Sequence, residues 1–205
     1  GQLGDINNDG WLDAVVTGEV SNNPISAVVY LNDGTGALVE DAVISGILLG
    51  LGGGSSAALG DYNGDGKLDL LMAGVSNAPT SAKSLILYNN IDGTDNISPT
   101  APSNISIEQN GTSIEFNWEQ LATGGEQTNG YSYNLYVQTN PGGTIFDAPH
   151  ADISDGSRSV IRVGNIQGPK WTINNIFPGS YSWGVQAIDQ NFEGSAFTSQ
   201  NFLSL

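Results

Sequence analysis

The side chains with the clearest potential for chemistry are the oxygen-bearing residues of the stretch 61–69, which follows the pattern D-x-N-x-D-G-x-x-D. Alternate side chains of a tight loop point to the same side, and Gly66 permits the sharp turn that such a loop needs. All the potential ligands are oxygens, which Ca²⁺ accepts in a flexible geometry. Zinc would require His or Cys, and the chain has one His and no Cys. The predicted calcium ligands are Asp61, Asn63, Asp65, the backbone carbonyl of Lys67, and Asp69.

The same pattern occurs 56 residues earlier, in the stretch 5–13. Each copy is preceded by Gly and followed by a short apolar segment that ends in Gly, at residues 14–18 and 70–74. Matched flanks indicate an internal repeat, so we expect two calcium sites; surface acidic turns without metal are the alternative. We expect the ring of Trp11 to lie outside its loop and to cover a neighbouring or missing repeat. The predicted ligands of this first site are Asp5, Asn7, Asp9, the backbone carbonyl of Trp11, and Asp13.

The segments that follow the loops distinguish between classes of calcium site. An EF-hand carries a Glu at loop position 12 and lies between helices, whereas Val16 and Met72 occupy that position here. The segments themselves are short, apolar and partly β-branched, which is typical of strands. The pattern G-D-x-N-x-D-G-x-x-D-x-x-x-x-G resembles the FG-GAP or VCBS-type repeat of integrin-α-like β-propellers. Residues 29–36 are similar to the Y-x-N-x-G-x-G hairpin of bacterial members, and residues 87–90 keep part of it.

This resemblance covers about residues 1–95 and implies blades of a β-propeller, in which calcium holds shut the loop between two strands. A closed propeller needs about four blades, and the chain supplies fewer than two. We expect the first strand of the first blade to be mostly missing before Gly4, and the last strand of the second to be missing or replaced after Asn90. The repeats would then be the end of a larger propeller in a longer parent chain, or an open stack that hides its edges elsewhere. The strands expected are 13–18, 26–31, 37–44, 55–60, 69–74 and 84–89.

A polar segment with two prolines ends the repeats and indicates a domain boundary. We place the repeats at residues 1–95, a linker at 96–102, and a second β domain at 103–205. Many short strands in about a hundred residues favour a sandwich. The strands expected there are 104–109, 112–118, 131–138, 159–163, 170–175, 180–188 and 195–203.

The second domain resembles a fibronectin type III domain. Residues 99–105 are similar to its P-x-x-P-x-x-L entry, and residues 176–189 to its L-x-P-G-x-Y-x-W-x-V-x-A-x-D segment. The resemblance implies that Trp118 lies in the core and that the hydroxyl of Tyr181 bonds back to the backbone as a tyrosine corner. The long middle, 139–158, departs from the family and is expected to be an inserted loop. The predicted fold is therefore all-β, with partial propeller blades followed by an Ig-like or fibronectin type III sandwich.

The formal net charge of −16 bears on partners and location. Two Ca²⁺ ions would reduce it to −12, which remains acidic and argues against nucleic acid and anionic membranes as partners. No apolar run approaches the length of a membrane span, so membrane insertion is not expected. We see no signal peptide, and the repeat pattern is already running at Gly1, so we expect a portion of a longer protein. Calcium can replace disulfides as a staple outside cells, which favours a secreted or cell-surface protein of a bacterium.

Enzymatic function is not expected, because the sequence contains no G-x-S-x-G, no P-loop and no His–Cys pair. His150, the sole His, stands in a predicted loop without an evident partner, so we interpret it as a solvated side chain. A set of aromatic residues could stack on sugar rings or, as we favour, fill the sandwich core. These aromatic residues are Trp118, Trp171, Trp183, Tyr131 and Tyr136.

The function predicted is that of a non-enzymatic, calcium-stabilised binding or adhesion module with an extracellular protein or glycan as ligand. The alternative is an accessory, carbohydrate-binding or spacer region of a secreted polysaccharide-degrading enzyme. An exposed planar row of aromatic side chains would favour the alternative, and buried Trp side chains would favour adhesion. A calcium sensor is disfavoured, because nothing resembles a switching pair of helices.

Overall fold

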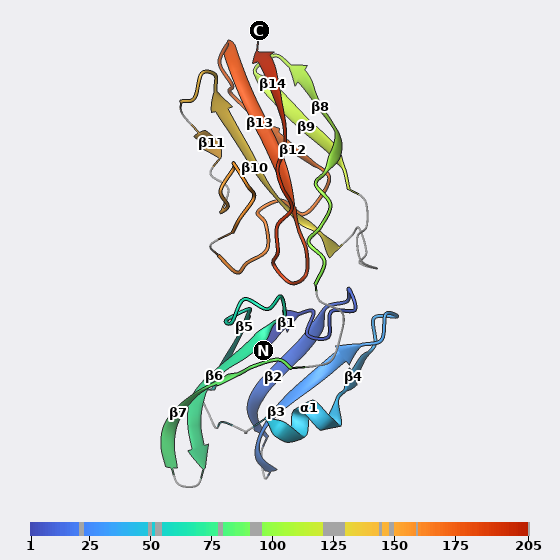
Figure 1. Ribbon diagram of the computed structural model, residues 1–205, viewed down its shortest axis with the longest axis vertical. Coiled ribbons are helices and arrows are strands. Elements are labelled where there is room, and N and C mark those ends of the chain that lie inside the picture. Colours follow the sequence, from blue (N-terminus) through green and yellow to red (C-terminus); the bar gives the residue numbers. More distant parts are fainter. Residues whose placement is uncertain are drawn as a thin grey trace. The chain divides into compact units, whose positions relative to one another are not determined.

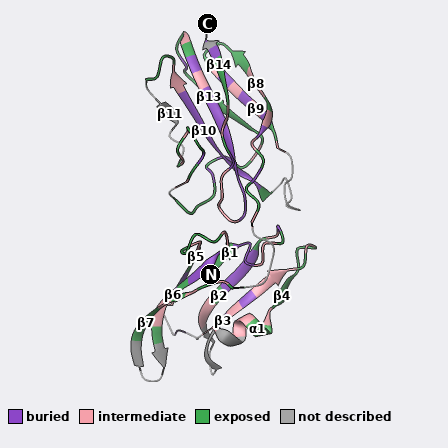
Figure 2. Cartoon of the chain, viewed as in Figure 1, coloured by how far each residue is buried: buried purple, intermediate pink, exposed green. Residues whose placement is uncertain are grey.

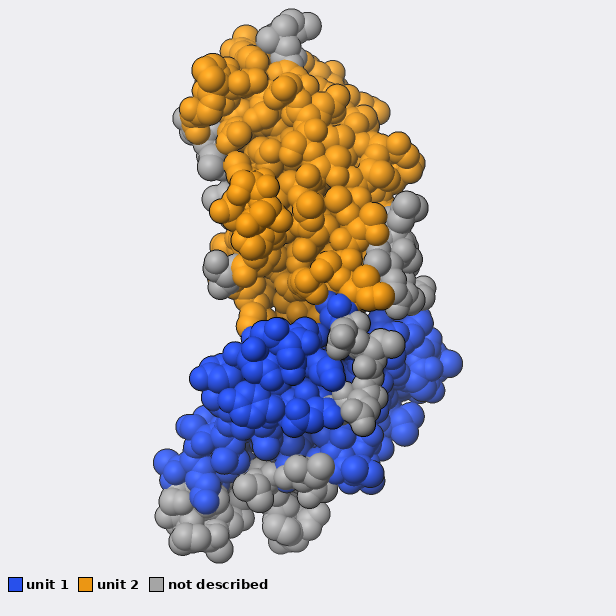
Figure 3. All heavy atoms as spheres, in the orientation of Figure 1, with its two compact units in different colours: residues 1–96 blue, residues 97–205 orange. Residues whose placement is uncertain are grey.

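The structure is a computed structural model that describes residues 1–20, 23–48, 51, 55–77, 80–90, 96–120, 130–143, 145–147, 150–158 and 160–204. The chain divides into two compact units, unit 1 (Gly1–Asn96) and unit 2 (Ile97–Leu205), which Figure 3 distinguishes by colour. Strands make up nearly all of the regular structure, which confirms the all-β prediction.

Unit 1 contains two antiparallel sheets (Figure 1). The first has the order β1-β2-β3-β4 and the second the order β5-β6-β7. The described strands do not close into a propeller or a barrel. The strands are β1 (Gln2–Gly4), β2 (Asp13–Val20), β3 (Asn23–Asn32), β4 (Leu38–Glu40), β5 (Ser56–Gly60), β6 (Asp69–Asn77) and β7 (Thr80–Leu87).

The core of unit 1 combines residues from both sheets. Val15, Ala27 and Val29 of the first sheet and Leu70 and Met72 of the second belong to one buried apolar cluster. Because side chains of a strand alternate between its faces, each sheet turns one face toward this core. The first strand of the first sheet, expected to be mostly missing, is present as the three-residue β1, which pairs with β2 and is two residues shorter than its counterpart β5.

A short helix, α1 (Ala42–Ile47), follows β4 and replaces the end of the strand predicted over 37–44. Asp41 caps this helix, since its carboxylate accepts hydrogen bonds from the backbone N–H groups of Val43 (2.9 Å) and Ile44 (2.8 Å). Ile44 packs against the core, whereas Val43 is 75% exposed. The strand prediction missed this cap, because an Asp before an apolar run is also compatible with a turn.

Unit 2 is a sandwich of two antiparallel sheets, with the strand orders β11-β10-β13-β14 and β12-β9-β8. Figure 2 shows buried residues concentrated along β10 and β13. The strands are β8 (Ser103–Asn110), β9 (Ser113–Glu119), β10 (Ser132–Thr139), β11 (Ile145–Asp147), β12 (Lys170–Ile173), β13 (Gly179–Ile188) and β14 (Thr198–Ser204).

The core of unit 2 is built from aromatic side chains. Trp118 and Trp183 are both buried in it, and the ring of Phe116 lies 4.8 Å from that of Trp183. The hydroxyl of Tyr181 donates to the backbone carbonyl of Phe177 at 2.9 Å, which confirms the predicted tyrosine corner. The burial of Trp118 confirms its predicted core position.

The region between β10 and β12 differs from the prediction. No strand is found over 160–163, and residue 159 lies outside the described residues, so the strand expected at 159–163 is wrong for the part that the structure describes. The segment just before residue 159 is instead held by Gln186 of β13. The side-chain amide of Gln186 donates to the carbonyls of Gly156 (2.6 Å) and Ser195 (2.7 Å). Gln186 lies on the face of β13 opposite Val185 and Ala187, where strand alternation predicts a polar residue exposed to solvent, yet its side chain is fully buried.

Candidate metal centre

The two predicted calcium loops occupy equivalent places in the two sheets of unit 1. Loop 1 (residues 5–13) connects β1 to β2, and loop 2 (residues 61–69) connects β5 to β6. Each loop therefore joins adjacent antiparallel strands, and its conformation is set by the ends of both.

Loop 1 is held by hydrogen bonds between its own backbone and side chains. The carboxylate of Asp5 accepts the N–H groups of Asp9 (3.1 Å) and Gly10 (2.8 Å). The Oδ1 of Asn7 accepts the same Asp9 N–H at 3.2 Å, so oxygens from positions one and three converge. Asp9 accepts the N–H of Trp11 and the side-chain amide of Asn7, each at 2.9 Å.

Loop 2 repeats this network at the equivalent positions. The carboxylate of Asp61 accepts the N–H groups of Asp65 (3.1 Å) and Gly66 (3.0 Å), and Asn63 Oδ1 accepts the same Asp65 N–H at 3.0 Å. Asp65 accepts the N–H of Lys67 at 3.0 Å and the side-chain amide of Asn63 at 2.9 Å. The two stretches are therefore repeats in conformation as well as in sequence.

Two positions in each loop have left-handed backbone angles. The fourth is Asn8 (φ 57°) in loop 1 and Gly64 (φ 77°) in loop 2. The sixth position is occupied by Gly10 (φ 88°) in loop 1 and by Gly66 (φ 79°) in loop 2. Gly adopts these angles readily and Asn and Asp adopt them more often than other residues do, which explains the Gly and Asn found there.

The ninth position of each loop is an Asp that joins the loop to the neighbouring hairpin. Asp13 is fully buried, and its two oxygens accept the N–H groups of Ile6 and Asn32, each at 2.8 Å. Asp69 is also buried and makes the equivalent contacts. Its donors are the backbone N–H groups of Tyr62 (3.0 Å) and Asn89 (2.8 Å).

An asparagine completes the arrangement in each repeat, at the end of β3 in the first and two residues after β7 in the second. The side-chain amide of Asn32 donates to the carbonyl of Leu12 at 3.2 Å, and that of Asn89 donates to Leu68 at the same distance. Asn89 also donates to the carbonyl of Ile6 in loop 1 at 2.7 Å, so it joins the two loops. Both asparagines belong to the hairpin pattern found in the sequence, but that pattern gives no indication of these contacts.

Burial and like charges act on the carboxylates of loop 1. Removal from water is the largest cause that raises the pKa of Asp5, to about 6, and the negative charges of Asp9 and Asp13 add to it. Hydrogen bonds from Gly10 and Asp9 oppose the rise. The pKa of Asp13 is also raised, mainly by burial. A bound cation would offset the cost of keeping these groups ionised.

The donor chemistry of both loops fits a hard cation, since every predicted ligand contributes an oxygen. Among the residues that the structure describes, no group of three or more His, Cys, Asp or Glu side chains is placed to hold a metal ion. In both loops the carboxylates at positions one, five and nine all accept backbone N–H groups. The structure thus brings together positions one, three and five of each loop and holds position nine beside them.

The ring of Trp11 lies within its own repeat, contrary to the expectation that it covers a neighbouring one. The indole is placed against Gly34 in the β3–β4 turn, where an added Cβ would come within 3.1 Å of Nε1. Gly34 has φ 80° and leaves room for the ring. A short hairpin therefore covers Trp11.

Most of the aromatic residues considered for sugar binding are buried. Trp118, Trp183, Tyr131 and Tyr136 are at most 6% exposed, and Trp171 is 42% exposed. This confirms the core interpretation for the majority of them. His150 is exposed, as predicted.

Residues 5–72 match a family model described as an FG-GAP-like repeat. A search of curated proteins finds no match. Among solved structures, the crystal structure of the chicken CNTN1 FN1–FN3 domains is similar at 9% identity and a TM-score of 0.39. That comparison covers 93% of this chain, which spans 66% of the length of the other. The region that contains both loops is therefore similar to FG-GAP repeats.

Proposed function

We propose that unit 1 binds two Ca²⁺ ions, one in each loop. The observation that carries the proposal is the hydrogen-bond network that the two loops share. The ligands would be the side chains at positions one, three, five and nine and the carbonyl at position seven. These ligands are Asp5, Asn7, Asp9, Trp11 and Asp13 in loop 1, and Asp61, Asn63, Asp65, Lys67 and Asp69 in loop 2.

Calcium would supply positive charge and coordination by many oxygens. The residues of the chain prepare for it by folding each loop through backbone hydrogen bonds, so that few conformational changes accompany binding. Because the ion binds the folded loop in preference to the unfolded chain, calcium is expected to stabilise unit 1 by mass action.

We further propose that the chain is a non-enzymatic, extracellular binding or adhesion module. Support comes from the FG-GAP-like repeat, which is typical of adhesion-type and accessory modules, and from the acidic composition, which suits calcium-rich surroundings. Burial of most of the large aromatic residues also favours adhesion over sugar binding. No helix among the described residues has the length and apolar character to cross a membrane.

One observation favours the alternative of an accessory region that binds carbohydrate. Tyr62, in loop 2, and Tyr88, which follows β7, are 68% and 51% exposed, and their ring centroids lie 6.1 Å apart. The rings are inclined at 50°, so they do not form the planar row that a flat sugar chain would require. Affinity electrophoresis through soluble polysaccharides, with Tyr62→Ala beside wild type, separates the alternatives. Retardation that the substitution abolishes would favour the accessory role.

The calcium proposal is tested by isothermal titration of the EDTA-treated chain, with calorimetric melting before and after. We expect two equivalents of calcium to bind and one melting transition to move upward. Magnesium serves as the control, because it demands a more rigid octahedral site and is expected to bind more weakly. Absence of calcium binding, or an equal effect of magnesium, would overturn the proposal.

A further inference from the structure

The two sheets of unit 1 have equivalent faces. In the first sheet, Val15 of β2 lies opposite Val29 of β3. Leu71 of β6 stands 56 residues after Val15, at the equivalent position of the repeat, and lies opposite Ile86 of β7. The pair Leu71 and Ile86 is therefore the structural equivalent of Val15 and Val29. We call the side of each sheet that carries these pairs face A. The opposite side, face B, carries Val16 in the first sheet.

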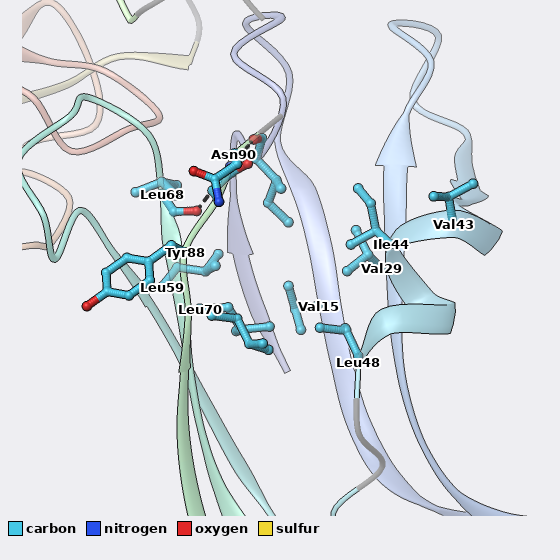
Figure 4. A pocket seen from close by; sticks show the side chains of 13 residues that line it. Val15, Val29, Val43, Ile44, Leu48, Leu59, Leu68, Leu70, Tyr88 and Asn90 are labelled. Atoms are coloured by element: carbon cyan, nitrogen blue, oxygen red, sulfur yellow. Dashed lines mark hydrogen bonds between the residues drawn. The ribbon is translucent and has the colours of Figure 1, made fainter. Parts of the chain in front are cut away.

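Within unit 1, face A of the first sheet packs on face B of the second. Val15 and Val29 are each 1% exposed and share a buried cluster with Leu70 and Met72, which lie on face B of β6. Figure 4 shows Val15 and Val29 across a cavity of about 430 Å³ from Leu70. The contact between the sheets is therefore heterologous, because it joins two different faces of the repeat.

The same two kinds of face are exposed on the outside of unit 1. On face A of the second sheet, Leu71 is 45% and Ile86 40% exposed, although their equivalents in the first sheet are buried. On face B of the first sheet, Val16 is 46% and Leu3 58% exposed, although Met72, the equivalent of Val16, is completely buried. Sheets that face water normally alternate apolar with polar residues, so these faces resemble interfaces that lack a partner.

We propose that the exposed face A of one chain binds the exposed face B of a second copy, head to tail. The contact would repeat the one already present between the two sheets, with Leu71 and Ile86 in the places of Val15 and Val29. The occupant follows from the repeat itself, since face B of the first sheet is the surface equivalent to the one that covers face A inside unit 1. A heterologous contact leaves one face of each kind free, so association would continue into a ring or a filament.

The net charge of −16 opposes the approach of two copies, so association is expected at physiological salt concentration and millimolar calcium rather than at low salt. Apolar sheet faces of this kind stabilise by removing side chains from water. Replacing one exposed apolar side chain at the centre of either face by a charged one would therefore block the contact. Because Leu71 and Val16 are about half exposed in the monomer, such substitutions leave the core intact.

The test is sedimentation velocity of the full chain over a range of concentrations. We expect wild type to exceed the monomer mass of 21.3 kDa and to continue past the dimer, whereas Leu71→Glu and Val16→Glu each remain monomeric. Leu71→Lys controls for charge, because it lowers the net negative charge and is still expected to block association. Phe177→Glu controls for added charge on an exposed apolar residue of unit 2 and is expected to associate like wild type.

Mixing the two blocked variants gives the decisive result. Leu71→Glu retains an intact face B and Val16→Glu an intact face A, so an equimolar mixture should form a 1:1 dimer and nothing larger. Wild type that stays monomeric would overturn the proposal and would leave the faces for a sheet of a different chain. A mixture that stays monomeric, or oligomers that both substitutions leave intact, would also overturn it.

Discussion

Replacing Asp13 by Ala in the absence of calcium separates the structural role of this carboxylate from any role as a ligand. Asp13 is fully buried and accepts the backbone N–H groups of Ile6 and Asn32, each at 2.8 Å. The substitution would leave two donors without an acceptor, at a cost of about 1–3 kcal/mol each. Removing a buried carboxylate whose pKa is raised by burial recovers part of that cost. We expect a net loss of about 2–4 kcal/mol in the free energy of unfolding.

Asp9→Ala is the matched control, since it removes a predicted ligand of the same loop from an exposed position. Asp9 accepts hydrogen bonds from the N–H of Trp11 and from the side-chain amide of Asn7. In the variant, both donors can form hydrogen bonds with water instead. Without calcium, the loss for Asp9→Ala should therefore stay below about 1 kcal/mol. With calcium, both variants should lose binding at loop 1.

Differential scanning calorimetry of the full chain in EDTA measures the difference. For a unit of this size, a loss of 2–4 kcal/mol corresponds to a fall of roughly 10–30 °C in one melting transition. Asp13→Asn retains one acceptor oxygen and should fall between wild type and Asp13→Ala. Equal melting temperatures for Asp13→Ala and Asp9→Ala in EDTA would refute the argument that position nine holds the loop to the hairpin.

Three further predictions concern the two units separately. Asp65→Ala should reduce the calcium stoichiometry from two to one in titration calorimetry, whereas Lys67→Ala should preserve it, because only the backbone carbonyl of that residue is a predicted ligand. A fragment of residues 97–205 should fold alone and melt at the same temperature in calcium and in EDTA; an EDTA-sensitive melt would contradict this. Gln186→Leu should destabilise that fragment by about 2–4 kcal/mol in urea denaturation, because buried carbonyls lose their donor. Gln200→Leu, at an exposed position of β14, should change stability by less than about 0.5 kcal/mol.

The parts of the fold that follow from short-range patterns could be predicted from the sequence. Short apolar segments after the calcium loops located β2 and β6, and the motif around Tyr181 located β13 and the tyrosine corner. The predictions failed where a single contact decided the structure. Asp41 starts a helix through its cap, and nothing in the apolar run after it distinguishes helix from strand over so few residues.

The residues of the two loops were predicted from the sequence, but the hydrogen bonds that join the loops to each other were not. The D-x-N-x-D-G-x-x-D spacing identifies both loops, because the loop makes most of its hydrogen bonds within itself. Asn89 shows what the spacing leaves out, since its amide reaches Ile6 of a loop more than eighty residues earlier in the chain. Contacts of this range depend on how the two sheets pack, which a motif within one repeat does not encode.

A continuous path of hydrogen bonds connects the two loops through these missed contacts. Asp13 accepts the N–H of Ile6, whose carbonyl accepts the side-chain amide of Asn89, whose own N–H donates to Asp69. The ninth-position carboxylates of both loops therefore hold the ends of one path, although they lie in different sheets. Because the path crosses the contact between the sheets, an ion that ordered one loop would also act on the packing that supports the other. The hydrogen-bonded connection between the loops thus depends on both sheets of unit 1. Its two ends, Asp13 and Asp69, occupy the same position in the two copies of the repeat.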